Sequence, residues 1–215
     1  MFEAVVLTLG FEPGPLVSAF AGAVAEGLSQ GALVVVFTAG FPDERSERAW
    51  LEFQRVVNMM EAPKRLGVEL ELREVPLDEM ATAILEIRRV LDGLRGKKVK
   101  VALTGGMRAL GLAVFSAVLL TRWADMPEVE VYLEGRGTAL KIPDLKALIR
   151  ASEKCIDLVE VMKSGPAKLD ELAKRLGKDR TTVYRKLRLL LNAGAAKKTP
   201  RGYELTPIGL ALANL

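Results

Sequence analysis

The sequence predicts an α/β protein of two domains, a Rossmann-like domain with a mainly parallel sheet over residues 1–145 and a smaller domain over residues 146–215. In the first part, short apolar runs alternate with longer helical patterns, as in a parallel sheet covered on both faces. Several of these runs end in turns that contain glycine. The charge is also divided: from Ala151 onwards there are 13 Lys and Arg and 7 Asp and Glu, whereas the first 150 residues carry 18 and 20.

Runs rich in valine, leucine and threonine predict the strands of the first domain. The expected strands are Ala4–Thr8, Ala32–Thr38, Val68–Val75, Val99–Leu103, Val129–Leu133 and Ala139–Ile142. The last two flank Gly135 and Gly137 and are typical of a closing hairpin.

Helical patterns between these strands predict helices over Leu16–Leu28, from an N-cap at Asp43 to Met60, over Leu77–Leu94 and over Met107–Trp123. The last of these is apolar almost all round. We therefore expect it to be buried, either within one subunit or at a subunit interface.

The second domain has the element order of a winged helix-turn-helix. A linking helix begins near Pro143 and either ends before the second domain or runs into it. The expected elements of that domain are helices at Glu153–Lys163, at Leu169–Leu176 and from an Asp179 cap to Asn192, a hairpin of Ala195–Lys198 with Gly202–Leu205, and a last helix at Ile208–Asn214. Between Lys178 and Arg201 there are eight basic residues and one acid, Asp179. Such a module usually binds duplex DNA.

Two sets of side chains are candidates for contact with DNA. The predicted helix from Asp179 to Asn192 is the one expected to enter the major groove. Near its start, Arg180, Thr181 and Tyr184 are expected at base edges. Thr182 is a further candidate, and the basic residues expected at phosphates are Arg185, Arg188, Lys197, Lys198 and Arg201. The alternative is a winged fold that contacts only protein, its charges forming a solvated face.

Composition excludes several kinds of chemistry. The chain contains no histidine and one cysteine, Cys155, so it has no histidine base, no Ser-His-Asp triad and no cysteine or histidine zinc site. Glu12 and Asp43 are read as a loop charge and a helix cap, so we expect no metal site and no catalytic residue. No apolar run is long enough to span a membrane, and no signal peptide is evident, which predicts a cytoplasmic protein. Scarce Asn and Gln, with many charged residues, indicate a thermophile.

Three loops follow the carboxyl ends of predicted strands, Gly10–Gly14, Thr38–Phe41 and Thr104–Arg108. Ligands of open parallel sheets bind at this edge, and backbone amides at a helix start favour anions. None of the loops is a Walker A motif or a complete GxGxxG fingerprint, which argues against ATP hydrolysis and NAD binding. The alternative is that the glycines are needed only for tight packing.

A first strand followed by Gly-Phe within Leu9–Pro13, a Thr-Gly-Gly turn before an apolar helix within Thr104–Arg108, and a C-terminal winged helix together resemble the CRISPR-associated CARF-domain transcription regulators. The resemblance implies a two-fold dimer that binds cyclic oligoadenylate, typically the tetra-adenylate, as a regulatory ligand across the dimer axis, with no cofactor. It implicates Gly10, Phe11, Glu12, Thr104, Gly105, Gly106, Met107 and Arg108. Sheet geometry adds Thr38, Ala39 and Gly40.

These observations lead us to expect a homodimeric, ligand-responsive transcription regulator of CRISPR-based antiviral defence, and not an enzyme. One alternative is a metal-independent ring nuclease in which Thr104 and Arg108 position the ribose hydroxyl and stabilise charge on the phosphate. Another is a regulator that senses a different nucleotide or metabolite.

Overall fold

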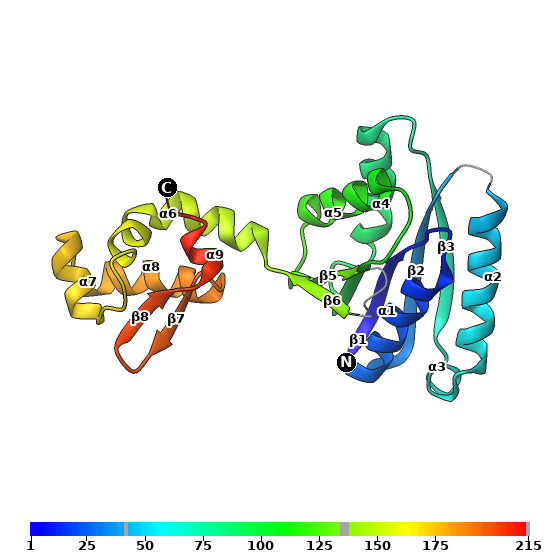
Figure 1. Cartoon of the computed structure of the whole chain (residues 1–215), viewed down its shortest axis with the longest axis horizontal. Helices are drawn as coiled ribbons and strands as arrows, with labels where there is room; N and C mark the ends of the chain where they lie inside the picture. The colour runs from blue at the N-terminus through cyan, green and yellow to red at the C-terminus, as the bar shows by residue number, and fades with distance from the viewer. Residues whose placement is uncertain (41–42, 134–137, 214–215) are drawn as a thin grey trace. The chain divides into compact units, whose positions relative to one another are not determined.

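The computed structural model describes residues 1–40, 43–133 and 138–213 (Figure 1). The chain divides into two compact units, Met1–Ile142 and Pro143–Leu215, and each is described by itself. In the described residues, no helix has the length and apolar character needed to cross a membrane.

The first unit is built on a six-stranded sheet in the order β3-β2-β1-β4-β5-β6. The strands are β1 Phe2–Thr8, β2 Leu28–Ala39, β3 Glu69–Val75, β4 Val99–Leu103, β5 Glu128–Leu133 and β6 Thr138–Ile142. All neighbouring pairs are parallel except β5 and β6, which form the antiparallel hairpin expected from the sequence. The order reverses between β1 and β4, and this switch point is where an open parallel sheet leaves room for a ligand.

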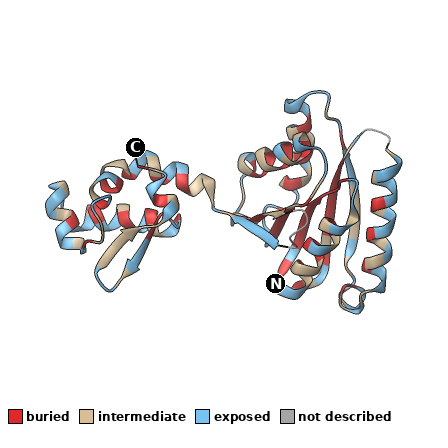
Figure 2. Cartoon of the chain, in the orientation of Figure 1, coloured by how far each residue is buried: buried red, intermediate tan, exposed pale blue. Residues whose placement is uncertain are grey.

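Helices cover both faces of the sheet, which confirms the Rossmann-like arrangement (Figure 1). They are α1 Pro13–Glu26, α2 Glu44–Met59, α3 Glu61–Leu66, α4 Met80–Asp92 and α5 Arg108–Leu120. On one face Phe20 of α1 and Phe53 of α2 pack edge to face, with ring centroids 5.6 Å apart. On the other, Ile87 of α4 and Val114 of α5 are fully buried. The central strands are therefore buried on both sides (Figure 2).

Several helix ends differ from the prediction. The first helix begins at Pro13, because a proline fits the first turn, and ends at Glu26, before Gly27 with a φ of +108°. Leu28 is therefore in β2 and not in the helix. The fourth predicted helix ends at Leu120 instead of Trp123, whose indole donates a hydrogen bond to the Val118 carbonyl. Helix α3 was not predicted, because six residues are too few to show a helical period.

Helix α5 is buried along one side and exposed along the other. Leu110, Val114 and Val118 are fully covered, whereas Leu112 and Leu120 are 61% and 57% exposed. The expectation of a buried helix is thus confirmed for one face only.

One charged side chain lies inside the first unit. Lys100, in β4, is 1% exposed, and its Nζ lies 2.7 Å from a carboxylate oxygen of Glu26 and 3.0 Å from one of Glu130. Glu130 is also buried, whereas the Glu26 side chain is 43% exposed. Burial and the negative charge of Glu130 raise the pKa of the neighbouring Tyr132 to about 12.

The second unit contains four helices and a two-stranded antiparallel sheet in its described residues. They are α6 Leu145–Met162, α7 Leu169–Leu176, α8 Arg180–Asn192, β7 Ala196–Thr199, β8 Gly202–Leu205 and α9 Pro207–Leu210. Leu158, Leu172, Val183, Leu187 and Leu190 form its core. Cys155 is also buried there, with its Sγ 3.6 Å from the Lys186 carbonyl oxygen.

Helix α6 joins the predicted linking helix and the predicted helix at Glu153–Lys163, which was one of the two arrangements expected from the sequence. It is one continuous helix, capped by Asp144, which accepts a hydrogen bond from the Ala147 amide at 3.0 Å. The final helix ends at Leu210, earlier than predicted, and Asn214 lies outside the described residues.

Candidate functional site

The loops after β1 and β4 touch at the switch point of the sheet. A Cβ at Gly10 would overlap the backbone nitrogen of Gly106, and a Cβ at Gly106 would lie 2.5 Å from the Leu9 carbonyl oxygen. Gly106 also has a φ of +92°, which side chains disfavour. Close packing of the two loops therefore accounts for these two glycines, as the packing alternative proposed.

Two threonines tie the ends of β1 and β4 together. Thr8 Oγ1 accepts hydrogen bonds from the amides of Thr104, at 3.0 Å, and Gly105, at 3.3 Å. The Thr104 hydroxyl donates to the Thr8 carbonyl, and Thr104 is 3% exposed. The hydroxyl that the sequence suggested for ligand contact is thus engaged inside the protein. Thr8 was not predicted as a site residue, because in the sequence it is only the last residue of an apolar strand.

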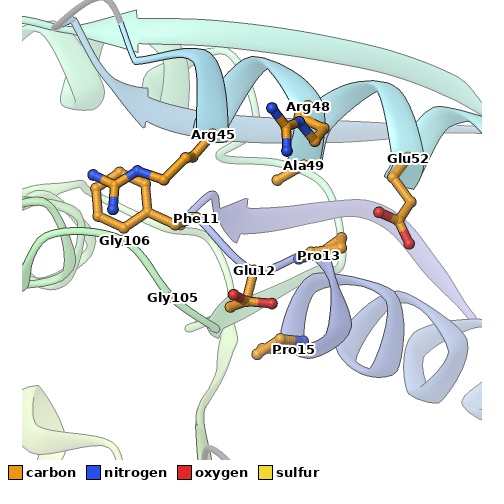
Figure 3. A pocket seen from close by; sticks show the side chains of 11 residues that line it. Phe11, Glu12, Pro13, Pro15, Arg45, Arg48, Ala49, Glu52, Gly105 and Gly106 are labelled. Atoms are coloured by element: carbon orange, nitrogen blue, oxygen red, sulfur yellow. The ribbon is translucent and has the colours of Figure 1, made fainter.

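A cavity of about 610 Å³ opens beside these loops (Figure 3). Five of its residues are among those predicted from the sequence: Gly10, Phe11, Glu12, Gly105 and Gly106. Helix α2 contributes Arg45, Arg48, Ala49 and Glu52, and the start of α1 contributes Pro13 and Pro15.

The side chains from α2 were not predicted. Arg45, Arg48 and Glu52 are spaced three and four residues apart, so they share one stripe of the helix. Ala49 and Phe53 are the buried residues of the same part of α2, and their packing into the core fixes the direction in which the stripe faces. Helical spacing in the sequence identifies this stripe. Only the fold shows which loops the stripe faces.

Arg45 covers the ring of Phe11 (Figure 3). Its guanidinium carbon lies 3.9 Å from the ring centroid, and the same group pairs with Asp43 at 3.0 Å. Asp43 also caps α2, as predicted, by accepting a hydrogen bond from the Arg45 amide at 2.8 Å. The hydrogen bonds from Arg45 lower the pKa of the Asp43 carboxyl, so the cap is ionised at neutral pH.

The start of α5 presents backbone amides that no side chain of the described residues caps. Met107 is its N-cap residue and makes no capping bond with its side chain. By contrast, α2 is capped by Asp43, and the first turn of α1 contains Pro13 and Pro15, which have no amide hydrogen. Arg108 begins α5 and is exposed, with no ion pair to any described residue. A helix start of this kind favours an anion.

The remaining predicted residues lie around neighbouring hollows. Thr38, Ala39 and Gly40 line a second cavity, of about 410 Å³. A small recess of about 60 Å³ joins Thr38 and Ala39 to Phe11, Gly106 and Met107. Arg108 lines none of these three hollows, and Phe41 lies outside the described residues.

The second unit carries a basic surface on α8 and the β7–β8 hairpin. The predicted residues at exposed positions are Arg180, Thr181, Tyr184, Arg185, Arg188, Lys197, Lys198 and Arg201. Thr182 is half-buried, and its amide donates to Asp179, which caps α8 as predicted.

Ion pairs divide the basic residues of α8, the hairpin and the turn before α8 into two groups, those with an acidic partner among the described residues and those without. Lys178 and Lys186 both pair with Asp157 of α6, at 2.5 Å. Arg180 pairs with Asp170 at 3.2 Å, and Lys197 pairs with Glu204 at 3.0 Å. In contrast, within the described residues no acidic partner lies against Arg185, Arg188, Lys198 or Arg201. These four cations are open to a partner outside the chain.

Asp157 joins α6 to α8. Its partial burial opposes ionisation, but hydrogen bonds from Lys178 and Lys186 outweigh that effect and lower its pKa to about 2. Lys178 and Lys186 therefore hold the unit together, which separates them from the open cations.

Residues 3–143 match the family described as the Csa3 CRISPR-associated Rossmann-like domain. The chain belongs to this family. The match confirms the expectation of a CRISPR-associated Rossmann-like domain and covers both glycine loops of the switch-point cavity. Residues 144–214 match a second family, described as the HVO_A0261 N-terminal domain. The Csa3-type domain and this second match meet between β6 and α6.

Other similarities are more local or more distant. Uncharacterized protein MJ1503 of Methanocaldococcus jannaschii is 41% identical over 39 residues, which are 18% of this chain and 30% of that protein. Can2 from Sulfobacillus thermosulfidooxidans, solved in complex with cyclic tetra-adenylate, is 13% identical, with a TM-score of 0.43 over 96% of this chain and 61% of that one. A RuvB variant of Thermotoga maritima is 14% identical, with a TM-score of 0.23 over 98% of this chain and 86% of that one. The chain thus spans less than a third of MJ1503 and about three fifths of Can2.

Proposed function

We propose that the chain is a homodimeric transcription regulator of a CRISPR–Cas system. Its Csa3-type domain binds cyclic oligoadenylate, with the tetra-adenylate as the first choice, and its second unit binds promoter DNA as a winged helix-turn-helix. The observation that carries the proposal is the presence, on one chain, of a CRISPR-associated Rossmann-like domain and a unit with open cations on α8 and the adjoining hairpin. A sensor joined to a DNA-binding unit is a regulator.

The chemistry of the switch-point cavity supports a nucleotide ligand. Gly105 and Gly106 line the cavity directly before α5, and the start of this helix, which has no side-chain cap, favours a phosphate. A cyclic tetranucleotide can present two-fold symmetry to a two-fold dimer, so that each subunit binds half of the ring. Leu112 and Leu120 support the dimer, because both are large apolar side chains left exposed on α5.

The order of elements in the second unit supports DNA binding. Helix α8 follows α7 after a turn at Gly177, whose φ is +62°, and the hairpin follows α8. In such modules the start of the second helix reads base edges in the major groove, while basic residues elsewhere contact phosphates. Arg180, Thr181 and Tyr184 fit the first role, and Arg188 and Lys198 fit the second.

Binding isotherms with promoter fragments at increasing salt test this part. We expect affinity that falls with salt, because each phosphate contact releases counterions. Sequence-specific binding that does not appear, or does not weaken with salt, would instead favour a protein-contact role for the basic face.

Coupling between the two units completes the proposal. A ligand regulates DNA binding only if it binds differently to two arrangements of the dimer, and α6, which follows directly on the Csa3-type domain, is the proposed lever. Equal DNA affinity with and without saturating cyclic tetra-adenylate would refute the coupling.

We propose a binding role and no catalytic role for the cavity. The Thr104 hydroxyl is already bonded to the Thr8 carbonyl, which argues against its use on a ribose hydroxyl. Incubation with cyclic tetra-adenylate tests the ring-nuclease alternative, and linear product that disappears in Arg108→Ala would establish it. A thermal-shift series with rings of different size and other nucleotides tests the ligand, because no shift with any ring would favour a different metabolite.

A further inference from the structure

Two arginines of α2 lie in the switch-point cavity, although α2 belongs to neither glycine loop. Arg45 and Arg48 line the cavity with Glu52, and Figure 3 shows them along one side of it, with Glu12 on the opposite side. We propose that Arg45 and Arg48 bind phosphates of the nucleotide ligand, and that Phe11 stacks on one of its bases through the ring face that Arg45 now covers. This inference rests on the proposed function.

Arg45 is held by interactions that a ligand can replace. Its side chain is 64% exposed, and among the described residues it contacts the ring of Phe11 and the carboxylate of Asp43. Ion pairs this exposed are weak, because water and salt compete with them. Release of the guanidinium also leaves α2 capped, since Asp43 still accepts from the Arg45 amide. Arg45 can therefore move to a phosphate without loss of the helix end.

Movement of Arg45 to a phosphate would uncover one face of the Phe11 ring. Phe11 is 45% exposed at the mouth of the cavity, where an apolar ring gains little from its position in the free protein. Stacking of a nucleobase on an exposed aromatic ring is a common contact in single-stranded nucleic acid binding. The guanidinium already stacked on this ring marks the face that a flat base would occupy.

Arg48 is an open cation in the same cavity. One helical turn separates it from Glu52, yet within the described part of the chain no ion pair joins Arg48 to that carboxylate or to any other. A charged guanidinium without a partner can bind a phosphate with two parallel hydrogen bonds.

The carboxylates in the cavity indicate a nucleotide rather than a simple anion. Glu12 and Glu52 balance the formal charges of Arg45 and Arg48, so the cavity lining offers a bare anion no net positive charge. They can accept hydrogen bonds from ribose hydroxyls or from the amino group of adenine, which a bare anion does not offer. Two cations, one aromatic ring and two acceptors together match the three chemical parts of a nucleotide.

Calorimetric titration with cyclic tetra-adenylate, and in parallel with cyclic hexa-adenylate, tests this assignment. The variants are Arg45→Gln, Arg48→Gln and Phe11→Ala, with Arg55→Gln as the matched control, since Arg55 is exposed on α2 but lies outside the cavity. We expect each of the three cavity variants to weaken binding about tenfold or more, and the control to stay within about twofold. Phe11→Tyr keeps the ring and should bind as tightly as the unmodified chain.

The outcomes separate the two proposals. If the unmodified chain binds neither ring, the proposed ligand is wrong and the assignment of α2 is withdrawn with it. If it binds, and Arg45→Gln and Arg48→Gln both match Arg55→Gln, the α2 assignment is overturned while the proposed function stands. Thermal unfolding of each variant checks that a loss of affinity does not come from a loss of fold.

Discussion

Replacement of Lys100 by methionine should strongly destabilise the first unit. Lys100 is 1% exposed and neutralises Glu130, which is itself buried, whereas its other partner, Glu26, can turn to water. Removal of one member of a buried ion pair costs about 3–5 kcal/mol, because the other charge stays behind without compensation. For a unit of this size, that loss corresponds to a fall in melting temperature of roughly 10–17 °C.

Tryptophan fluorescence during urea unfolding measures this effect in one unit only. Both tryptophans of the chain, Trp50 and Trp123, belong to the first unit, so the second unit does not contribute to the signal. The matched control is the double variant Lys100→Met with Glu130→Leu, which removes both charges and should recover most of the lost stability. A loss below about 1 kcal/mol in the single variant would refute the reasoning, because Glu130 would then be solvated or neutral without Lys100.

Three further predictions concern both units. The pKa of Asp157 in the folded protein is about 2, below its unfolded value, so this carboxylate contributes stability that is present above about pH 4 and is lost as the pH falls toward 2. Asp157→Asn should remove this pH-dependent part of the unfolding free energy, roughly 1 kcal/mol, which acid unfolding followed by circular dichroism measures. Gly106→Ala should cost about 1–3 kcal/mol and weaken ligand binding, because its φ is positive and its Cβ would meet the Leu9 carbonyl; unchanged thermal stability would contradict this. Arg188→Ala should reduce the salt slope of DNA binding by about one, whereas Arg89→Ala in the first unit should leave it unchanged, and equal slopes would remove Arg188 from the interface.

The sheet and the helix caps were predictable because their signals are local. Continuous apolar runs gave the strands of a sheet that is covered on both faces, and Asp43 and Asp179 were recognised as caps from their position before a helical pattern. Helix α1 was placed wrongly at both ends, since a proline in the first turn reads as a breaker unless the chain before it is known to turn.

The cavity was only half predictable. The glycine loops are visible as strand-to-helix turns, but Arg45 and Arg48 come from a different helix, and nothing local says which loop they face. Lys100 is a stronger case. It reads as a polar residue in a short strand, and its buried state depends on Glu130 of β5 and on Glu26, which lies 74 residues away along the chain. Such pairs follow from the order of strands and helices in space, which single-sequence patterns do not contain.

The buried position of Cys155 makes the chain convenient for site-directed labelling. It is the one cysteine in the sequence, it is fully covered in the core of the second unit, and burial raises the pKa of its thiol. An exposed thiolate attacks electrophilic labelling reagents, whereas this buried thiol should remain unmodified while the unit is folded. A cysteine introduced at Met59 or Lys198 can then carry a spin label or fluorophore without removal of the native residue. A pair of such labels would measure how far the two units move when a nucleotide is added.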